Sequence, residues 1–470
     1  MRTSSRVVLT TITVALAVIA VLVVRARASD THKAGYVPKV RDHVDHSAFF
    51  TTKFDSPQAV TRACLKCHPD AGKQMLRSVH WTWEGKPVEV PGHAGKYGLG
   101  KKTVMNNFCL SIESNWPSCT ICHAGYGWKD ASFDFTAEDN IDCLVCHEHT
   151  GDYRKGKAGV PEPGVDLLAS AKSVGTPKRE NCGSCHFYGG GGLGVKHGDL
   201  DNSLEHPSAG TDVHMGKLGM LCVDCHKTTD HDIRGVAYSV QVDHDNGIGC
   251  EDCHQSVPHK DPRINRHLSA VACQTCHIPT FANRVPTKMD WDWSKAGDSS
   301  RPDDVHHYLK IKGEFIYDES VVPTYTWFNM TVDRYLVGDK IDPTQVTALN
   351  PPRGNIHDKT AKIWPFKVHT AKQPYDKVYN YLLLPNTAGP GGYWTEFDWP
   401  KALATGAETA HLQFSGQYGF ATTTMYWPLS HMVVPKEHAL GCPDCHGEHG
   451  RLDWTALGYS DDPIRAGGRQ

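Results

Sequence analysis

The stretch of residues 222–277 reads CVDCHKTTDHDIRGVAYSVQVDHDNGIGCEDCHQSVPHKDPRINRHLSAVACQTCH and contains one five-residue pattern three times. The pattern is Cys-x-x-Cys-His, and its copies along the whole chain account for 16 of the 17 cysteines. In chain order the copies are Cys64-Cys67-His68, Cys119-Cys122-His123, Cys143-Cys146-His147, Cys182-Cys185-His186, Cys222-Cys225-His226, Cys250-Cys253-His254, Cys273-Cys276-His277 and Cys442-Cys445-His446.

This pattern is the attachment motif of c-type haem. The two thiols, three residues apart on one turn, add across the two vinyl groups of a haem, and the adjacent histidine reaches the iron from the same face. A single Cys-x-x-Cys would also fit a redox dithiol or half of a zinc site. Because every copy is followed by histidine, we predict eight covalently bound haem c groups with the eight motif histidines as proximal ligands.

Composition indicates how such a chain folds. Hydrophobic residues make up only 39% of it, whereas it has 43 glycines and 28 prolines. The haems must therefore supply much of the apolar interior. We expect a mainly α fold with extensive irregular coil and little β, built around a packed haem array.

The charge distribution bears on the partners. The formal net charge of −3 becomes about −10 when the haem propionates are counted. Lysine and arginine are scattered rather than clustered, which excludes a nucleic-acid-binding footprint. A small inorganic anion would need a local positive pocket to bind.

The N-terminal segment predicts export. Arg2 and Arg6 precede an apolar run over residues 7–24, and the ARA sequence at 26–28 offers a cleavage site. Residues 1–28 are thus either a signal peptide or an N-terminal membrane anchor. Either role places the haem-binding part in the periplasm, soluble or anchored to the inner membrane.

The spacing of the motifs predicts one continuous unit rather than separate domains. The expected organisation is a single octahaem unit over residues 29–470, with seven motifs within 64–277, a haem-free aromatic-rich block over 278–441 and the eighth motif at 442–446. Within the block, Glu314–Tyr317 and Tyr379–Leu384 are typical of short strands or buried segments. The block is expected to pack over one side of the array or to form a homo-oligomer contact.

Histidines outside the motifs are candidates for the distal iron ligands, because haems that only carry electrons usually take a second histidine. Their positions near motifs favour His80, His197, His214, His231, His244, His267 and His438, with His206, His259 and His431 in reserve. Each also has an alternative role as a surface or hydrogen-bonding histidine.

One cysteine lies outside the motifs. Cys109 follows the sequence Asn106-Asn107-Phe108. In an exported protein an unpaired thiol is either a reactive group or a small buried apolar residue.

Three segments resemble the octahaem tetrathionate reductases. They are MNNFCLSIESNWPSCTICHAGYGWKD (Met105–Asp130), CLVCHEHTGDYRKGKAG (Cys143–Gly159) and GVKHGDL (Gly194–Leu200). The number and order of the motifs, including the late eighth one, are also similar. The resemblance therefore spans nearly the whole exported chain.

In that family one haem has a lysine amine as its distal ligand, and a cysteine lies in the same pocket. The resemblance implies that the ligand here is Lys155, over the haem of His123, with Asp152 nearby. It also places Cys109 in the pocket, and Asn106 beside it. Without the resemblance, Lys155 would be interpreted as part of a solvated basic turn with its neighbours at 154 and 157.

Lysine ligation has chemical consequences. Only a neutral amine binds iron, so ligation releases a proton from a group whose ordinary pKa is near 10.4. A lysine amine on its flexible stem is also an exchangeable ligand. On leaving the iron it would regain a proton and become a positive group above an anionic substrate, where Asp152 would hold the ammonium or relay a proton.

The resemblance implies a reductase of small sulfur or nitrogen oxyanions. Tetrathionate is the substrate that the family name gives, and nitrite and hydroxylamine are further candidates. A redox partner protein, such as a membrane quinol-oxidising cytochrome, would supply the electrons. One alternative is a non-catalytic electron-transfer protein or extracellular conduit; another is an enzyme that oxidises hydroxylamine. A labile non-histidine ligand on one iron would favour the reductase over the conduit.

Overall fold

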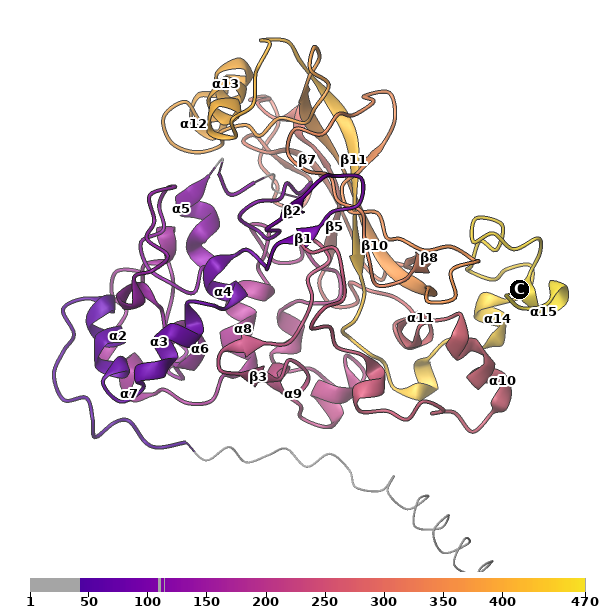
Figure 1. The fold of residues 1–470 in the computed structure, drawn as a ribbon, viewed down its shortest axis with the longest axis horizontal. Coiled ribbons are helices and arrows are strands. Elements are labelled where there is room, and N and C mark those ends of the chain that lie inside the picture. The colour runs from indigo at the N-terminus through magenta and orange to yellow at the C-terminus, as the bar shows by residue number, and fades with distance from the viewer. Residues whose placement is uncertain (1–42, 109–110, 114, 470) are drawn as a thin grey trace, which may run out of the picture.

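The computed structural model describes residues 43–108, 111–113 and 115–469, and the proposed N-terminal signal or anchor and Cys109 lie outside them. Short helices joined by long connections make up most of the described chain (Figure 1). The helices are α2 (Pro57–Leu65), α3 (Pro69–Met75), α4 (Val79–Thr82), α5 (Trp116–Cys119), α6 (Leu144–His147), α7 (Leu167–Lys172), α8 (Arg179–His186), α9 (Cys222–Cys225), α10 (Pro262–Asn265), α11 (Cys273–His277), α12 (Tyr393–Glu396), α13 (Trp399–Thr409), α14 (Cys442–Cys445) and α15 (Pro463–Ala466). The strands are β1 (Val88–Glu89), β2 (Lys96–Tyr97), β3 (Thr228–Thr229), β4 (Asp232–Ile233), β5 (Thr287–Asp292), β6 (Tyr308–Leu309), β7 (Gly313–Asp318), β8 (Thr324–Phe328), β9 (Thr347–Ala348), β10 (Lys362–Asp376) and β11 (Tyr418–Pro428).

Most attachment motifs lie on these short helices. The motif cysteines belong wholly or partly to α2, α5, α6, α8, α9, α11 and α14, and the sixth motif begins a 3-10 turn at Cys250–Asp252. A helical turn brings residues three apart onto the same face, which is the arrangement that two thiols need to reach one haem. The first of these helices begins at Pro57, where a missing N–H costs nothing, and the Ser56 hydroxyl accepts from the Ala59 N–H at 3.2 Å.

Residues 278–441 contain a seven-stranded sheet. Its order is β6-β7-β5-β10-β11-β9, and β8 pairs with the first part of β10. The long central strand β10 is antiparallel to β11, in register from Phe366 opposite Pro428 to Asp376 opposite Tyr418. Most β10 side chains are buried on both faces, because the strand runs through the middle of the sheet.

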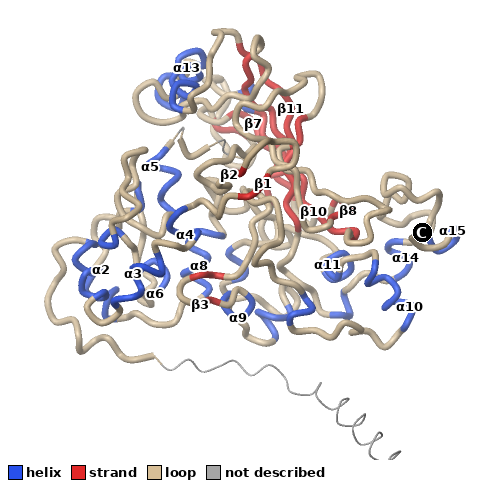
Figure 2. The backbone as a smooth tube through the Cα atoms, in the orientation of Figure 1, coloured by secondary structure: helices blue, strands red, loops and turns tan. Residues whose placement is uncertain are grey.

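The sheet packs over the row of helices that carries the motifs, as Figure 2 shows. Two hydrogen bonds join α11 to β10: the Ala272 N–H donates to the Ile363 carbonyl at 3.0 Å, and the Thr275 hydroxyl donates to the same oxygen at 2.7 Å. The haem-free block thus covers one side of the motif-bearing helices, which is one of the two roles expected for it.

The fold class is confirmed in part. Short helices, much coil and a small share of strand agree with the prediction, but seven of the strands form one extended sheet, while β1-β2 and β3-β4 are separate pairs. The run Glu314–Tyr317 falls in β7, as expected. The run Tyr379–Leu384 is not a strand but is a buried segment, since Leu382, Leu383 and Leu384 are almost wholly shielded from solvent.

No helix within residues 43–108, 111–113 and 115–469 is long and apolar enough to cross a membrane.

Replacing Leu382 tests the packing under the sheet. Its side chain is fully buried against Trp291 and its neighbours, so Leu382→Ala should lower the free energy of unfolding by about 2–5 kcal/mol. Val378, in the same connection, is 53% exposed, and Val378→Ala should change that free energy by less than about 0.5 kcal/mol. Guanidinium unfolding followed by circular dichroism measures both. Equal losses in the two variants would contradict this packing.

Candidate haem and active site

Six of the motif histidines each lie against a second histidine from elsewhere in the chain. The two ring centroids are 6.0–6.3 Å apart in every pair. The pairs are His68 with His46, His186 with His80, His226 with His431, His254 with His214, His277 with His259 and His446 with His267.

This separation suits an iron held between two imidazoles. Bonds from histidine nitrogen to a metal are about 2 Å long, so rings on opposite sides of one iron have centroids roughly 6 Å apart. The residues present therefore fit haem iron at these motifs. At a seventh motif, His231 is the histidine whose charge most strongly lowers the pKa of His147, after the effect of burial. Gln74 orients the His231 ring by a contact to Nδ1 at 3.0 Å.

The structure places some of the predicted distal histidines beside motif histidines and others elsewhere. It brings His80, His214 and His267 against motif histidines, together with the reserve candidates His259 and His431, and it leaves His231 near His147. The other candidates have different surroundings: His197 packs on Trp427, His244 contacts the Tyr238 hydroxyl at 2.6 Å, and His206 and His438 are exposed.

His46 was missed. It precedes the first motif in a segment whose sequence carries no haem-related pattern, and only the folded chain brings its ring to His68. Its Nδ1 contacts the Val44 carbonyl at 2.7 Å, which leaves the other ring nitrogen for iron.

Removing His46 should therefore change the spin state of one haem. His46→Ala leaves the iron of the first motif without its second imidazole, so a high-spin ferric signal should appear in the EPR spectrum. His206→Ala is the matched control, because His206 is exposed and its ring meets only Glu180, at 3.8 Å. Identical low-spin spectra in both variants would contradict the assignment of His46.

His123 differs from the other motif histidines. Its ring is wholly buried among aromatic side chains, with Trp81, Trp128 and Phe133 at centroid distances of 5.0, 4.8 and 5.4 Å. Among the described residues no other histidine ring packs against it. Its Nε2 contacts the Trp81 carbonyl at 2.7 Å, and its Nδ1 is buried without a hydrogen-bond partner. Among the described residues, His123 therefore has neither the second histidine ring that six motif histidines have nor the histidine charge that acts on His147.

Lys155 lies under this motif in a buried ion pair. Its Nζ is 2.6 Å from Asp142 Oδ2 and donates to the His123 carbonyl at 2.7 Å. The side chains of Lys155 and Asp142 are 6% and 0% exposed. The carboxylate that holds the lysine is therefore Asp142, whereas Asp152 is exposed.

Asp142 is itself the centre of a buried network. The hydroxyls of Tyr126 and Tyr153 both donate to its Oδ1 at 3.0 Å, and the Val145 N–H donates at 3.1 Å. Burial, reinforced by the Asp142 charge, raises the pKa of both phenols, so they stay protonated donors. Lys155 thus connects the backbone of the second motif to a fully bonded carboxylate.

Lys196 differs from Lys155 in that no carboxylate of the described residues pairs with it. Within the described residues its Nζ has no hydrogen bond or carboxylate partner, and its contact is the face of Trp427, 5.5 Å from the ring centroid. Burial, reinforced by the charge of Lys101, lowers the pKa of Lys196 to about 8. Its charge in turn reaches Cys122 of the second motif. Lys196 lies in the GVKHGDL segment, which the resemblance had already singled out.

The central sheet positions the segments on both sides of Trp427. The Asn107 side chain donates to the His369 carbonyl on β10 at 2.8 Å, and the Gln373 side chain donates to the Asn106 carbonyl at 3.0 Å. Phe108 packs on Trp427 with ring centroids 5.3 Å apart. The segment that leads to Cys109 is therefore attached to β10 and β11.

The Lys196 segment is attached to the same sheet. The fully buried ammonium of Lys367 on β10 donates to the Lys196 carbonyl at 3.1 Å and to the Thr287 hydroxyl at 2.6 Å. Thr287 in turn donates to the Gly194 carbonyl at 2.8 Å. Burial lowers the pKa of Lys367 to about 7, since no carboxylate among the described residues bonds it.

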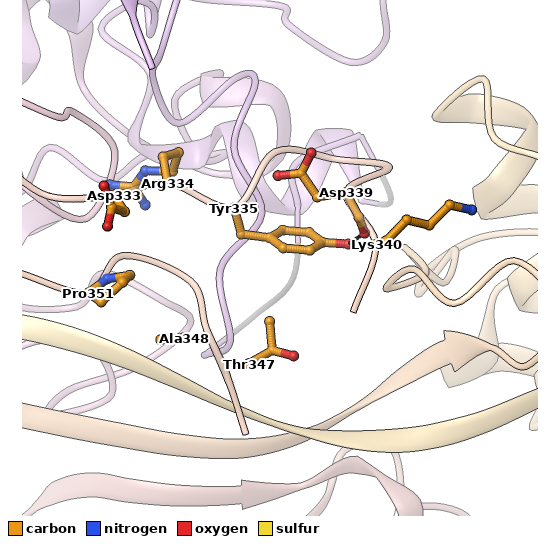
Figure 3. Close-up of a pocket in the computed structure, with 8 residues that line it drawn as sticks. All are labelled: Asp333, Arg334, Tyr335, Asp339, Lys340, Thr347, Ala348 and Pro351. Atoms are coloured by element: carbon orange, nitrogen blue, oxygen red, sulfur yellow. Dashed lines mark hydrogen bonds between the residues drawn. The ribbon is translucent and has the colours of Figure 1, made fainter. Parts of the chain in front are cut away.

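A separate hollow of about 380 Å³ lies in the haem-free block. It is lined by Asp333, Arg334, Tyr335, Asp339, Lys340, Thr347, Ala348 and Pro351 (Figure 3). The Tyr335 ring spans it, and its hydroxyl donates to the Asp339 carbonyl at 2.9 Å. None of the lining residues belongs to an attachment motif, so this hollow is not part of the haem-binding machinery.

Known proteins match this arrangement. A solved structure described as octaheme cytochrome c from Shewanella oneidensis is 46% identical, with a TM-score of 0.84, and the match covers 91% of this chain and 100% of that one. This chain belongs to the octahaem c-type cytochromes. The family model "Cytochrome c bacterial" matches residues 288–449, and an uncharacterised protein of Archaeoglobus fulgidus is 25% identical over 240 residues, which is 40% of this chain and 80% of that protein.

Contacts between motif cysteines give the order of the haem sites in this octahaem cytochrome, numbered here by their motifs. Thiols of different motifs meet in the pairs Cys64–Cys143, Cys122–Cys185, Cys182–Cys222 and Cys250–Cys273. The pairs Cys146–Cys182, Cys225–Cys253 and Cys276–Cys445 lie close enough for their charges to interact. The sites thus follow the order 1-3-4-5-6-7-8, and site 2 branches from site 4.

Proposed function

We propose that this octahaem cytochrome is a periplasmic reductase of small sulfur or nitrogen oxyanions, with tetrathionate, nitrite and hydroxylamine as candidates. Haem 2 is its active site, and the other haems form a packed array that feeds it. The observation that carries the proposal is the surroundings of His123: among the described residues no histidine ring packs against it, and the charges that lower its pKa are those of Lys155 and Lys101 rather than that of a histidine. An iron without a second imidazole keeps a position for an exchangeable ligand or substrate.

Lys196 is the better candidate for the lysine ligand that the resemblance implies. Ligation needs an amine that gives up its proton readily. The Lys155 ammonium is held by a carboxylate and two backbone carbonyls, whereas Lys196 lies over the Trp427 ring and near Lys101, whose charge lowers its pKa, and Cys122, whose charge raises it. Protonated and released, Lys196 would be a positive group beside the segment that leads to Cys109.

The chain's own residues supply the remaining chemistry of the pocket. Haem iron supplies electrons when bound; Lys196, Lys367 and Lys101 give the surroundings the positive charge that an anion needs. Trp427 and Phe108 exclude water from one side. Lys196 would also deliver a proton to the reduced product, since an amine with a lowered pKa is a good donor near neutral pH.

Protein-film voltammetry combined with EPR tests this proposal. Lys196→Ala should abolish most of the catalytic current given by tetrathionate, nitrite or hydroxylamine and change the EPR signal of one haem. Lys155→Ala should keep that EPR signal but lower the free energy of unfolding by about 3–5 kcal/mol, because Asp142 is left buried without its partner. A changed signal in Lys155→Ala with none in Lys196→Ala would return the ligand to Lys155.

A substitution of Cys109 distinguishes a sulfur substrate from a nitrogen substrate. As a thiolate it would attack a central sulfur of tetrathionate, breaking the central sulfur–sulfur bond, releasing one thiosulfate and keeping the other half as a cysteine S-thiosulfate. Two electrons from the haems would then release that half as the second thiosulfate and regenerate the thiolate. Cys109→Ser should then lower the tetrathionate current at least tenfold more than the nitrite current. Equal losses with both substrates would leave the thiol without a chemical role.

A second candidate function is electron transfer alone. The unbroken order of sites 1-3-4-5-6-7-8 supports it, because a relay needs neighbours close together from end to end. Non-catalytic waves that are the same with and without the three substrates would favour this function. In either case a redox protein, such as a membrane quinol-oxidising cytochrome, is the proposed electron donor.

A further inference from the structure

The row of haem sites has two ends. Site 1 is at α2 and site 8 at α14, and these helices lie at opposite sides of the molecule (Figure 1). Site 2 branches from the row between them, next to site 4. An end is where a donor protein reaches the row, so the relative reduction potentials of the two ends decide which of them receives electrons.

At site 8 a buried carboxylate bonds the proximal histidine. Asp462 Oδ1 is 2.6 Å from His446 Nδ1, and the Asp462 side chain is only 3% exposed. The N–H groups of Gly447 and Ile464 donate to Asp462 at 2.7 and 3.0 Å. Both carboxylate oxygens therefore accept hydrogen bonds, and the group is held in place against the ring.

The other motif histidines of the described chain lack this contact. A comparable one occurs inside the row, where the second histidine of site 5, His431, lies 3.3 Å from buried Asp199; neither histidine of site 1 is in such a contact within the described residues. His147 and His226 donate from Nδ1 to the neutral carbonyls of Gly175 and Arg234, at 2.9 and 2.8 Å. At the opposite end of the row, the Nδ1 of His46 faces the Val44 carbonyl. The second histidine of site 8, His267, also faces a carbonyl, that of Arg263 at 3.1 Å.

A carboxylate that accepts the Nδ1 proton makes the imidazole a stronger donor to the metal. A stronger donor and a nearby negative charge both favour ferric over ferrous iron, so they lower the reduction potential. Reduction of a haem held there would add one electron to its iron and break no bond. The effect therefore acts through His446 on the electron affinity of the iron.

We propose that Asp462 is a tuning residue that makes haem 8 the low-potential end of the row, where electrons enter. From there electrons move toward site 4 and its neighbour site 2. The proposal does not depend on the substrate, because it concerns the potentials of the row and holds for a reductase and for a relay.

Potentiometric titration of the holoprotein, followed by EPR and absorbance, tests it. Asp462→Asn keeps the size of the side chain and removes its charge, so one of the eight reduction steps should move to higher potential. Asp461→Asn is the control: it removes the same charge one residue earlier, from an exposed group that pairs with Arg465 at 2.8 Å. The proposal is overturned if neither variant shifts a reduction step. It is also overturned if both variants shift one by the same amount.

A measurement on the wild-type protein decides the matter if Asp462→Asn binds fewer than eight haems. The Trp454 ring stacks on His446, with centroids 5.2 Å apart, and its protons identify the haem 8 signals in an NMR-monitored titration. Haem 8 should be reduced at a lower potential than haem 1. The reverse order of these two haems would refute Asp462 as the group that defines the entry end.

Discussion

A ring separation of about 6 Å between two imidazoles is the constraint on which the rest of this molecule depends. Six motif histidines meet it, and each second histidine comes from another part of the chain. Residues as distant as His226 and His431 must therefore be brought together. Long irregular connections suit this constraint better than long helices, because each connection needs only to place one histidine ring next to one iron.

The sheet orders the segments that are not bonded to a haem. A haem holds the residues bonded to it, but it does not order the segments beyond its edge. Asn107 and Thr287 are anchored by hydrogen bonds to β10 or to its buried Lys367. These bonds hold Phe108 and Lys196 against Trp427. Their positions are thus fixed by the sheet, which is the pre-organisation that the proposed anion site would need.

The sequence predicted the parts that depend on local chemistry. Eight Cys-x-x-Cys-His motifs define their proximal ligands whatever the fold, and short helices follow from the same spacing. The strand at Glu314–Tyr317 was also predictable from its residues. Neither the sheet order nor His46 was, since β5 pairs in parallel with β10 across a long connection, and His46 meets His68 only in the folded chain.

The two lysines show why a site cannot be assigned from motif position alone. Lys155 and Lys196 both lie in segments that resemble the octahaem reductases, and both reach the second motif. Their surroundings differ. Lys155 has a buried carboxylate at 2.6 Å, whereas Lys196 lies over the Trp427 ring, where burial and the charge of Lys101 lower its pKa and the Cys122 charge raises it. An ammonium bonded to a carboxylate is stabilised as a cation, while one without a partner is driven toward the neutral amine that iron binds. The proposed ligation by Lys196 therefore rests on contacts made by long-range folding rather than on the local sequence.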